Sequence, residues 1–176
     1  SLMPNCLTIF IFKILYFILI FSIFLLTIYY IYAIYCLLSI KKRIFILKNL
    51  YMAYGSNLNL GQMKYRCPKA RQLGSFYLPN YKLVFRGVAD IEPTKDSDSL
   101  LPVGVWEITE KCEKTLDIYE GVKRGMYRKE YINGMLTYRM NTTDIFPPSR
   151  DYFTSILIGY NNFGLNPAHL YDALGW

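Results

Sequence analysis

The sequence has 176 residues and a formal net charge of +7, a balance that ordinarily favours a nucleic-acid or membrane partner. The excess charge lies in the first fifty residues, which hold five basic residues and no acidic one, whereas residues 51 to 176 hold fifteen basic and thirteen acidic residues. The part after residue 50 is therefore the size of one domain and close to neutral, which argues against nucleic-acid binding.

The cysteines and the histidine give no sign of a metal centre. Cys6, Cys36, Cys67 and Cys112 form no C-x-x-C pair, and His169, the single histidine, has no partner at metal-ligand spacing. We therefore expect no metal site and no disulfide framework, and reduced thiols in a cytoplasmic compartment.

Residues 1 to 43 form a hydrophobic segment, which we separate from a domain of residues 44 to 176. From residue 14 to residue 40 the chain carries no charge over 27 consecutive residues, more than the roughly 20 that cross a bilayer as a helix. The apolar core of a signal peptide is usually shorter, about 7 to 15 residues. The segment thus predicts a membrane anchor, and the basic residues 41 to 43 place the domain in the cytoplasm.

Two other interpretations of this segment stay open. Its composition, dominated by Ile, Phe, Leu, Tyr and Lys, is what an AT-rich upstream region would encode if it were read through by mis-annotation. Alternatively, the apolar span is the part on which the function mainly depends, and the protein works chiefly as a membrane-tethered interaction protein.

Short strands and helices follow the apolar segment. A run of β-formers ends at Gly55 and predicts a strand at 49 to 54, and a short helix then stops before Pro68. Three short apolar runs between residues 74 and 93 are typical of a β-meander. "PVGVWEI", residues 102 to 108, predicts a further strand.

The second half of the domain has clear element boundaries. Thr109 is a good helix N-cap and Gly121 stands where a glycine would end that helix. Asn133-Gly134 predicts a β-hairpin, residues 152 to 160 have helical spacing, and Asn166-Pro167 begins a last short helix. We predict an α+β domain: a small mixed, mainly antiparallel β-sheet or barrel flanked by helices.

Glu120 is a candidate acid/base residue. It lies in the last turn of the predicted helix, where the negative end of the helix dipole disfavours an anion and should raise the carboxyl pKa. A carboxylate tuned towards neutrality suits proton transfer at physiological pH. The alternative is a solvated glutamate that happens to stand at a helix end.

A turn of small polar residues, Tyr54, Gly55, Ser56 and Asn57, follows the first strand. Most such turns only connect elements, but backbone N–H groups at the start of a helix can also hold a carboxylate or phosphate. Tyr127 and Tyr152 stand at expected element starts, so their hydroxyls could reach a pocket.

Four stretches together resemble the γ-glutamyl cyclotransferase-like superfamily. They are "AYGSNL" at 53 to 58, "VGVWEIT" at 103 to 109, "LDIYEGVKRGMYRKEYI" at 116 to 132 and "PPSRDY" at 147 to 152. Their order and spacing agree with that family over residues 50 to about 165, whereas the first fifty residues have no counterpart there.

The resemblance implies a set of site residues. In that family the YGSNL loop binds the α-carboxylate and amine end of a γ-glutamyl group, and the glutamate of the EG motif is the acid/base. By motif match, Glu120 would be catalytic, and the substrate-binding residues would be Tyr54, Gly55, Ser56, Asn57, Leu58, Tyr127 and Tyr152.

The implied reaction needs no metal, nucleotide or covalent intermediate. The α-amine of a small γ-glutamyl substrate attacks its own γ-carbonyl, which gives 5-oxoproline and a free amine or amino acid. The alternative is a non-catalytic module of the same fold that binds a γ-glutamyl ligand or a partner, since fold does not fix function.

Overall fold

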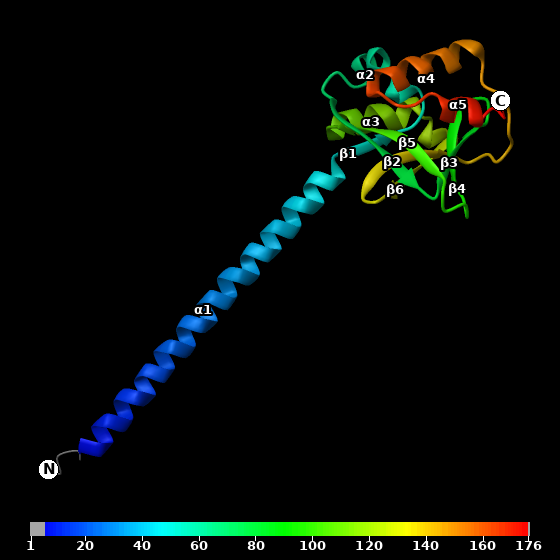
Figure 1. Cartoon of the computed structure of the whole chain (residues 1–176). Coiled ribbons are helices and arrows are strands. Elements are labelled where there is room, and N and C mark those ends of the chain that lie inside the picture. The colour runs from blue at the N-terminus through cyan, green and yellow to red at the C-terminus, as the bar shows by residue number, and fades with distance from the viewer. Residues whose placement is uncertain (1–5, 176) are drawn as a thin grey trace. The chain divides into compact units, whose positions relative to one another are not determined.

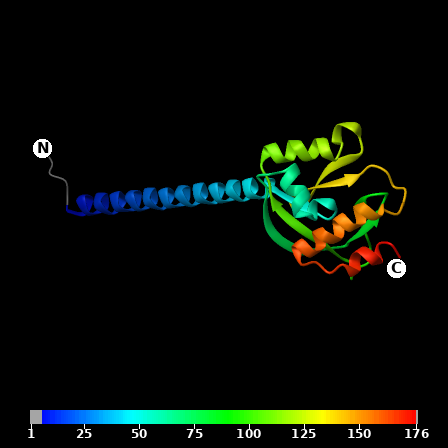
Figure 2. The same cartoon turned by 90° about the horizontal axis from the view of Figure 1, so that it is seen from above.

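A computed structural model describes the chain from residue 6 to residue 175, and its side chains from Ile9 to Lys42 and from Asn49 to Gly175. By internal contacts the chain divides into two units, Ser1–Phe45 and Ile46–Trp176. Figures 1 and 2 show the elements of each unit from two directions.

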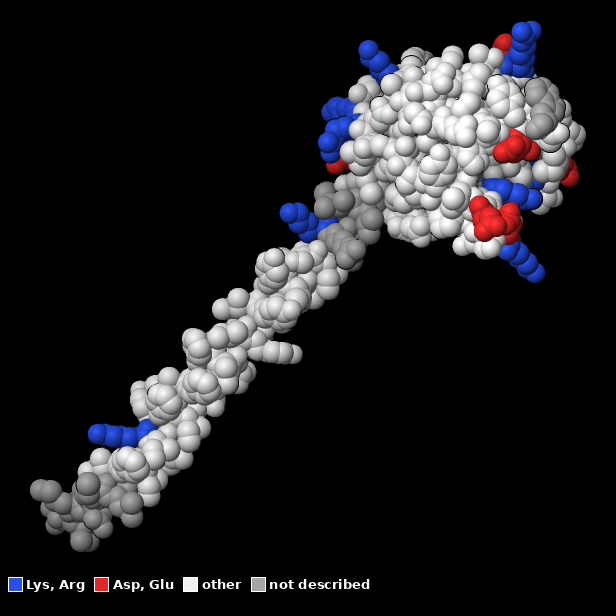
Figure 3. Space-filling view, in the orientation of Figure 1, with Lys and Arg blue, Asp and Glu red and all other residues white. Residues whose placement is uncertain are grey.

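The first unit consists almost wholly of one helix, α1 (Cys6–Lys48). Its stretch Ile9–Lys42 has a mean hydropathy of 2.8, and none of that stretch is buried inside the structure. Apolar side chains cover the helix, and charged ones are sparse along it (Figure 3). A helix of this length and composition suits a membrane span, but near an N-terminus a signal sequence has the same properties.

The second unit is built on a five-stranded sheet in the order β2-β5-β1-β7-β6. Its strands are β1 (Leu50–Ala53), β2 (Arg71–Pro79), β5 (Leu100–Glu107), β6 (Tyr127–Ile132) and β7 (Met135–Met140). All neighbours are antiparallel except β1 and β7, which are parallel. A separate antiparallel pair, β3 (Tyr81–Phe85) and β4 (Ala89–Pro93), completes the strands of the described residues.

Helices flank this sheet. They are α2 (Leu60–Arg66), α3 (Glu110–Tyr119), α4 (Arg150–Phe163) and α5 (Ala168–Asp172), with 3-10 turns at Ser56–Leu58 (η1) and Val122–Arg124 (η2). Figure 2 shows α3 and α4 on opposite sides of the domain, with α2 between them. The predicted α+β class, a mainly antiparallel sheet flanked by helices and preceded by an apolar segment, is confirmed.

The predicted β-meander is wrong in its pairing. All three runs form strands, but β2 pairs with β5, and only β3 and β4 form a hairpin. A single residue, Asn80, separates β2 from β3, and it takes a left-handed conformation with φ 61°. The strands β2 and β3 lie in different sheets and do not pair with each other, because one residue is shorter than the loops of two or more residues that commonly close a hairpin.

The YGSN turn is held in place by close packing behind it. Leu58 is fully buried, and two glycines, Gly104 in β5 and Gly159 in α4, leave room for it. A Cβ added at either glycine would lie 2.6 Å from an atom of the Leu58 side chain. The turn is thus fixed between the sheet and α4 by a hydrophobic anchor.

Candidate active site

The central strand β1 delivers the YGSN turn to a pocket at its carboxyl end. Within the turn the N–H of Leu58 donates to the Gly55 carbonyl at 2.9 Å, and the N–H of Asn59 donates to the Ser56 carbonyl at 3.0 Å. Among the described residues, the N–H groups of Gly55, Ser56 and Asn57 donate to no backbone carbonyl, and that of Ser56 is directed at the Tyr152 hydroxyl, whereas those of Gly55 and Asn57 have no protein acceptor. Two N–H groups of the turn are therefore available to an anion.

Asn57 joins the turn to Glu120. Its side-chain N–H groups donate to the Glu120 carboxylate at 2.9 Å and to the Tyr51 hydroxyl at 2.7 Å. Its own amide oxygen accepts from Arg66, and its backbone carbonyl accepts from the Trp106 indole at 3.0 Å. Because its amide oxygen is held by Arg66, the Asn57 side chain turns its NH2 group, and not its oxygen, towards the Glu120 carboxylate.

Arg66 supports this arrangement from α2. Its guanidinium donates to the Ser56 hydroxyl at 3.1 Å and stacks over the Tyr119 ring at 3.8 Å from the ring centroid. Both contacts orient the turn and the end of α3 relative to each other.

Glu120 is the C-cap of α3, followed by Gly121 in a left-handed conformation with φ 64°. The pKa of its carboxyl is raised above the usual value, chiefly because the group is buried, while the hydrogen bond from Asn57 and the charge of Arg66 lower it. The direction agrees with the prediction. The main cause is desolvation, however, whereas the sequence pointed to the helix dipole.

Two tyrosine hydroxyls meet on the Ala89 peptide at the start of β4. Tyr152, in the first turn of α4, accepts from the Ala89 N–H at 3.0 Å, and Tyr127, at the start of β6, donates to the Ala89 carbonyl at 3.2 Å. The two hydroxyls therefore differ in the hydrogen bond that each can still form with a ligand. Tyr152 keeps its proton to donate, and Tyr127 keeps lone pairs to accept.

The absence of a side chain at Gly55 keeps this corner open. A Cβ there would lie 3.1 Å from the Ala89 Cβ and 3.3 Å from the Tyr152 hydroxyl. Any larger residue would press the turn away from the tyrosine that faces it.

The structure brings seven of the eight sequence-predicted site residues into one pocket. It is lined by Tyr51, Tyr54, Gly55, Ser56, Asn57, Ala89, Glu120, Tyr127, Tyr138 and Tyr152. Leu58 is the exception, because its side chain packs in the core and its N–H is used inside the turn.

Sequence reasoning missed three lining residues, Tyr51, Ala89 and Tyr138. The rings of Tyr51 and Tyr138 pack edge to face with centroids 5.8 Å apart, and the Tyr138 hydroxyl donates to Asp117 at 2.8 Å. Tyr51 stands only three residues before Tyr54, so its position in the same short strand was the available signal. Ala89 and Tyr138 carried none.

Neither a protein-family model nor a curated protein sequence matches the chain. The solved structure of an uncharacterised protein from Homo sapiens is similar with a TM-score of 0.62 and 27% identity, over 70% of this chain and 85% of that one. A structure described as gamma-glutamyl cyclotransferase gives a TM-score of 0.60 and 26% identity, again over 70% of this chain and 85% of that one.

YkqA from Bacillus subtilis shares the fold at 21% identity, with a TM-score of 0.56 over 70% of this chain and 51% of that chain. Fold and motif order now point the same way, because the YGSN, EG and PPS-x-x-Y segments read from the sequence meet in one pocket. The chain thus belongs by its fold to the γ-glutamyl cyclotransferase-like superfamily.

Proposed function

We propose that residues 44 to 176 form a cofactor-independent γ-glutamyl cyclotransferase, which cyclises a γ-glutamyl group to 5-oxoproline and releases an amine or amino acid. The observation that carries the proposal is the 2.9 Å hydrogen bond from Asn57 to Glu120. It sets a carboxylate of raised pKa directly beside a turn with two free N–H groups. An acid/base and an anion site in one pocket are what this reaction requires.

In this mechanism the substrate supplies its own nucleophile. The ionised Glu120 takes a proton from the substrate ammonium group, and the amine lone pair then attacks the γ-carbonyl carbon while the carbonyl π electrons move to oxygen. Collapse of this intermediate breaks the bond to the leaving amine, which receives the proton from Glu120. The ring nitrogen then gives its second proton back to Glu120, which leaves the neutral lactam, and that proton passes to the released amine or to solvent. Because both reacting groups belong to one molecule, the protein mainly orients them and carries the proton.

The remaining residues would hold the substrate. The free N–H groups of Gly55 and Asn57 suit the α-carboxylate, and the available Tyr152 proton suits a carboxylate or developing oxyanion. The lone pairs of Tyr127 suit the substrate ammonium group. Ser56 and Tyr54 complete the wall on the side of the turn.

The test is release of 5-oxoproline by the full chain in detergent micelles, followed by mass spectrometry. The panel would hold γ-glutamyl amino acids, γ-glutamyl amines and a γ-glutamyl-lysine fragment. Release from one class supports the proposal and identifies the leaving group. No release by a folded chain whose unfolding temperature rises with a γ-glutamyl compound would instead support a binding module.

The two tyrosines on Ala89 allow a matched comparison. We expect Tyr152→Phe to lower kcat/KM by about tenfold to a hundredfold, as for a lost hydrogen bond to a charged group. Tyr127→Phe removes a bond to the same peptide but no free donor, so we expect a smaller loss at a similar unfolding temperature. Equal losses would contradict the assigned polarity of the two hydroxyls.

We propose that α1 anchors the domain in a membrane, with the basic residues 41 to 43 on the cytoplasmic side. We expect the full chain, made in cells, to stay in the membrane pellet after an alkaline carbonate wash. A variant that lacks residues 14 to 40 is the control and should be released. Recovery of the native protein in the supernatant without its first forty residues would overturn the anchor.

A further inference from the structure

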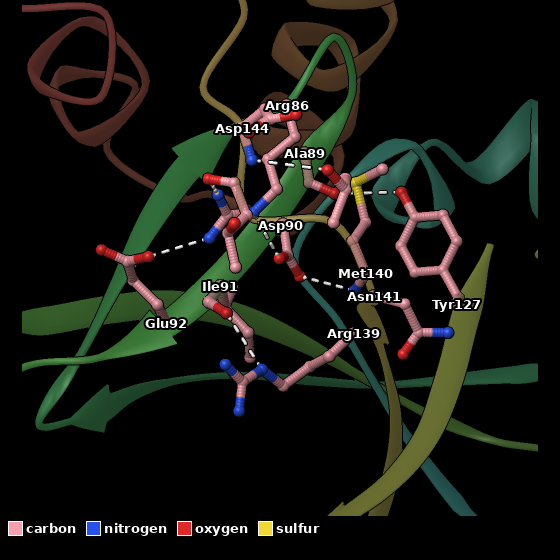
Figure 4. Close-up of polar contacts among 12 residues, drawn as sticks. Arg86, Ala89, Asp90, Ile91, Glu92, Tyr127, Arg139, Met140, Asn141 and Asp144 are labelled. Atoms are coloured by element: carbon pink, nitrogen blue, oxygen red, sulfur yellow. Dashed lines mark hydrogen bonds and ion pairs between the residues drawn. The ribbon is translucent and has the colours of Figure 1, made fainter. Parts of the chain in front are cut away.

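Beside the pocket, Arg86 and Asp90 form a buried ion pair. The Arg86 Nε lies 2.9 Å from Asp90 Oδ2, and the side chains are only 5% and 2% exposed. Figure 4 shows the pair between β4 and the segment that follows β7. Burying such a pair contributes little net stability, because desolvation offsets the attraction. Its consequence therefore lies in the groups that it orients.

The Asp90 carboxylate connects three strands or their ends. Its second oxygen, Oδ1, accepts from the Met140 N–H at 3.1 Å, at the end of β7. The Tyr54 hydroxyl, just after β1, lies 3.4 Å from the same oxygen, while it also donates over a shorter distance to the Tyr138 carbonyl. The hairpin of β3 and β4 belongs to a separate sheet. Asp90 thus fastens the start of β4 to the main sheet at the point where the YGSN turn begins.

Arg86 holds Asp90 from the other side. Its guanidinium also donates to the Thr143 carbonyl and to Glu92 at 2.9 Å, so it is fixed at three points. Arg139 on β7 adds a further link, donating to the Ile91 carbonyl of β4 at 3.0 Å (Figure 4). The position of β4 relative to β7 is therefore set by charged hydrogen bonds.

Ala89 precedes Asp90 in β4. Its N–H donates to the Tyr152 hydroxyl, and its carbonyl accepts from the Tyr127 hydroxyl. A shift of Asp90 would move Ala89, and both hydroxyls would follow or lose their bonds. Tyr54 would lose its contact with the carboxylate in the same event.

We propose that Asp90, held by Arg86, is a positioning residue that sets the Ala89 peptide, and through it the hydroxyls of Tyr127 and Tyr152, in the pocket. The inference rests on the proposed cyclotransferase function. Asp90 does not line the pocket, so it acts through its neighbours and takes no part in proton transfer.

The test compares Asp90→Asn with Glu92→Gln in the full chain. Both remove a carboxylate that binds Arg86, but only Asp90 borders Ala89 and contacts Tyr54. We expect Asp90→Asn to lower kcat by at least about tenfold, the scale of a small misplacement in an active site, and Glu92→Gln to change it by less than about twofold. Comparable losses of kcat in the two variants would overturn the proposal.

Two further readouts separate positioning from loss of stability. Ile91 is fully buried in β4, so Ile91→Val loosens the packing of that strand. It leaves the carboxylates of Asp90 and Glu92 in place. It should lower the unfolding temperature and leave kcat unchanged. For Asp90→Asn the plateau of the pH–rate profile should fall while its acidic midpoint stays in place, because Glu120 remains the titrating group.

Asp90→Asn leaves a buried guanidinium with one partner fewer and can fail to fold. The double variant Arg86→Gln/Asp90→Asn keeps a neutral hydrogen bond of similar shape, and we expect it to recover kcat relative to Asp90→Asn. A parent chain without 5-oxoproline release would refute the proposed function. An active parent with an equally active, folded Asp90→Asn would refute the positioning role alone.

Discussion

Glu120→Gln is expected to reduce 5-oxoproline release by about 10²- to 10⁴-fold, the usual contribution of a general acid/base. Glutamine fills the same space and keeps an oxygen that can accept from Asn57, so the neighbouring turn should not move. What the variant loses is the ability to take a proton from the substrate ammonium group. The measurement is kcat/KM for the preferred substrate of the panel.

Stability provides the folding control for this variant, with a defined sign. Burial raises the pKa of Glu120 in the folded state, so folding favours the protonated form. That contribution is fully present below the ordinary glutamate pKa and is lost as pH rises through the raised value. At neutral pH the folded protein therefore carries a disfavoured charge.

We consequently expect Glu120→Gln to be at least as stable as the parent at neutral pH, with the difference closing as the solution is acidified below the ordinary glutamate range. Thermal unfolding over a pH series measures this. Glu110→Gln, at an exposed position in the first turn of the same helix, is the matched control and should show no such gain. A less stable Glu120→Gln at neutral pH would mean that its loss of activity reflects unfolding.

Local signals made much of the fold predictable from the sequence. Thr109 accepts from the Cys112 N–H at 3.2 Å, as the predicted N-cap of α3 should, and Gly121 follows its end. Asn133 and Gly134 both have positive φ and close the predicted hairpin. These boundaries depend on a few adjacent residues, so a single sequence contains them.

Long-range pairing could not be predicted in the same way. The pairing of β2 with β5 joins residues such as Phe76 and Val103, and no turn residue between neighbouring runs indicates it. The same limit applied to the pocket. The motifs gave Glu120 and the turn, but Ala89 and Tyr138 enter the site only because the fold brings distant segments together.

Glu120 illustrates the difference between a local and a tertiary cause. Its place at a helix end is visible in the sequence and predicted the direction of its pKa shift. The larger cause is burial, which depends on the turn, the end of α3 and several tyrosines closing around it. Sequence position alone could not supply that environment.

Gly159→Ala should destabilise the domain and impair the site, although alanine is the better helix former by about 1 kcal/mol. Gly159 lies inside α4, and a Cβ there would stand 2.6 Å from the Leu58 Cβ and 2.8 Å from the Asn59 backbone nitrogen. Backbone atoms cannot rotate away, so the YGSN turn itself must shift. Overpacking of this kind costs about 1 to 3 kcal/mol, which outweighs the gain in propensity.

Two controls isolate the displacement of the turn as the cause. Gly104→Ala also presses on Leu58, but the three atoms nearest to its Cβ belong to the side chains of Leu58 and Phe163. Side chains can adjust more easily than backbone, so we expect lower stability with more of the kcat/KM retained. Thr154→Ala, at an exposed position of α4 away from the turn, reports helix propensity together with the loss of the Thr154 hydroxyl bond to the Arg150 carbonyl. Two results would contradict this explanation: a higher unfolding temperature for Gly159→Ala, or an equal loss of activity in Gly104→Ala at equal stability. In either case the contact between α4 and the turn backbone would not determine the position of the anion site. If Gly159→Ala lowers kcat/KM more than Gly104→Ala, as we expect, the turn keeps its position because Gly159 has no side chain and lets α4 pack directly against the turn backbone.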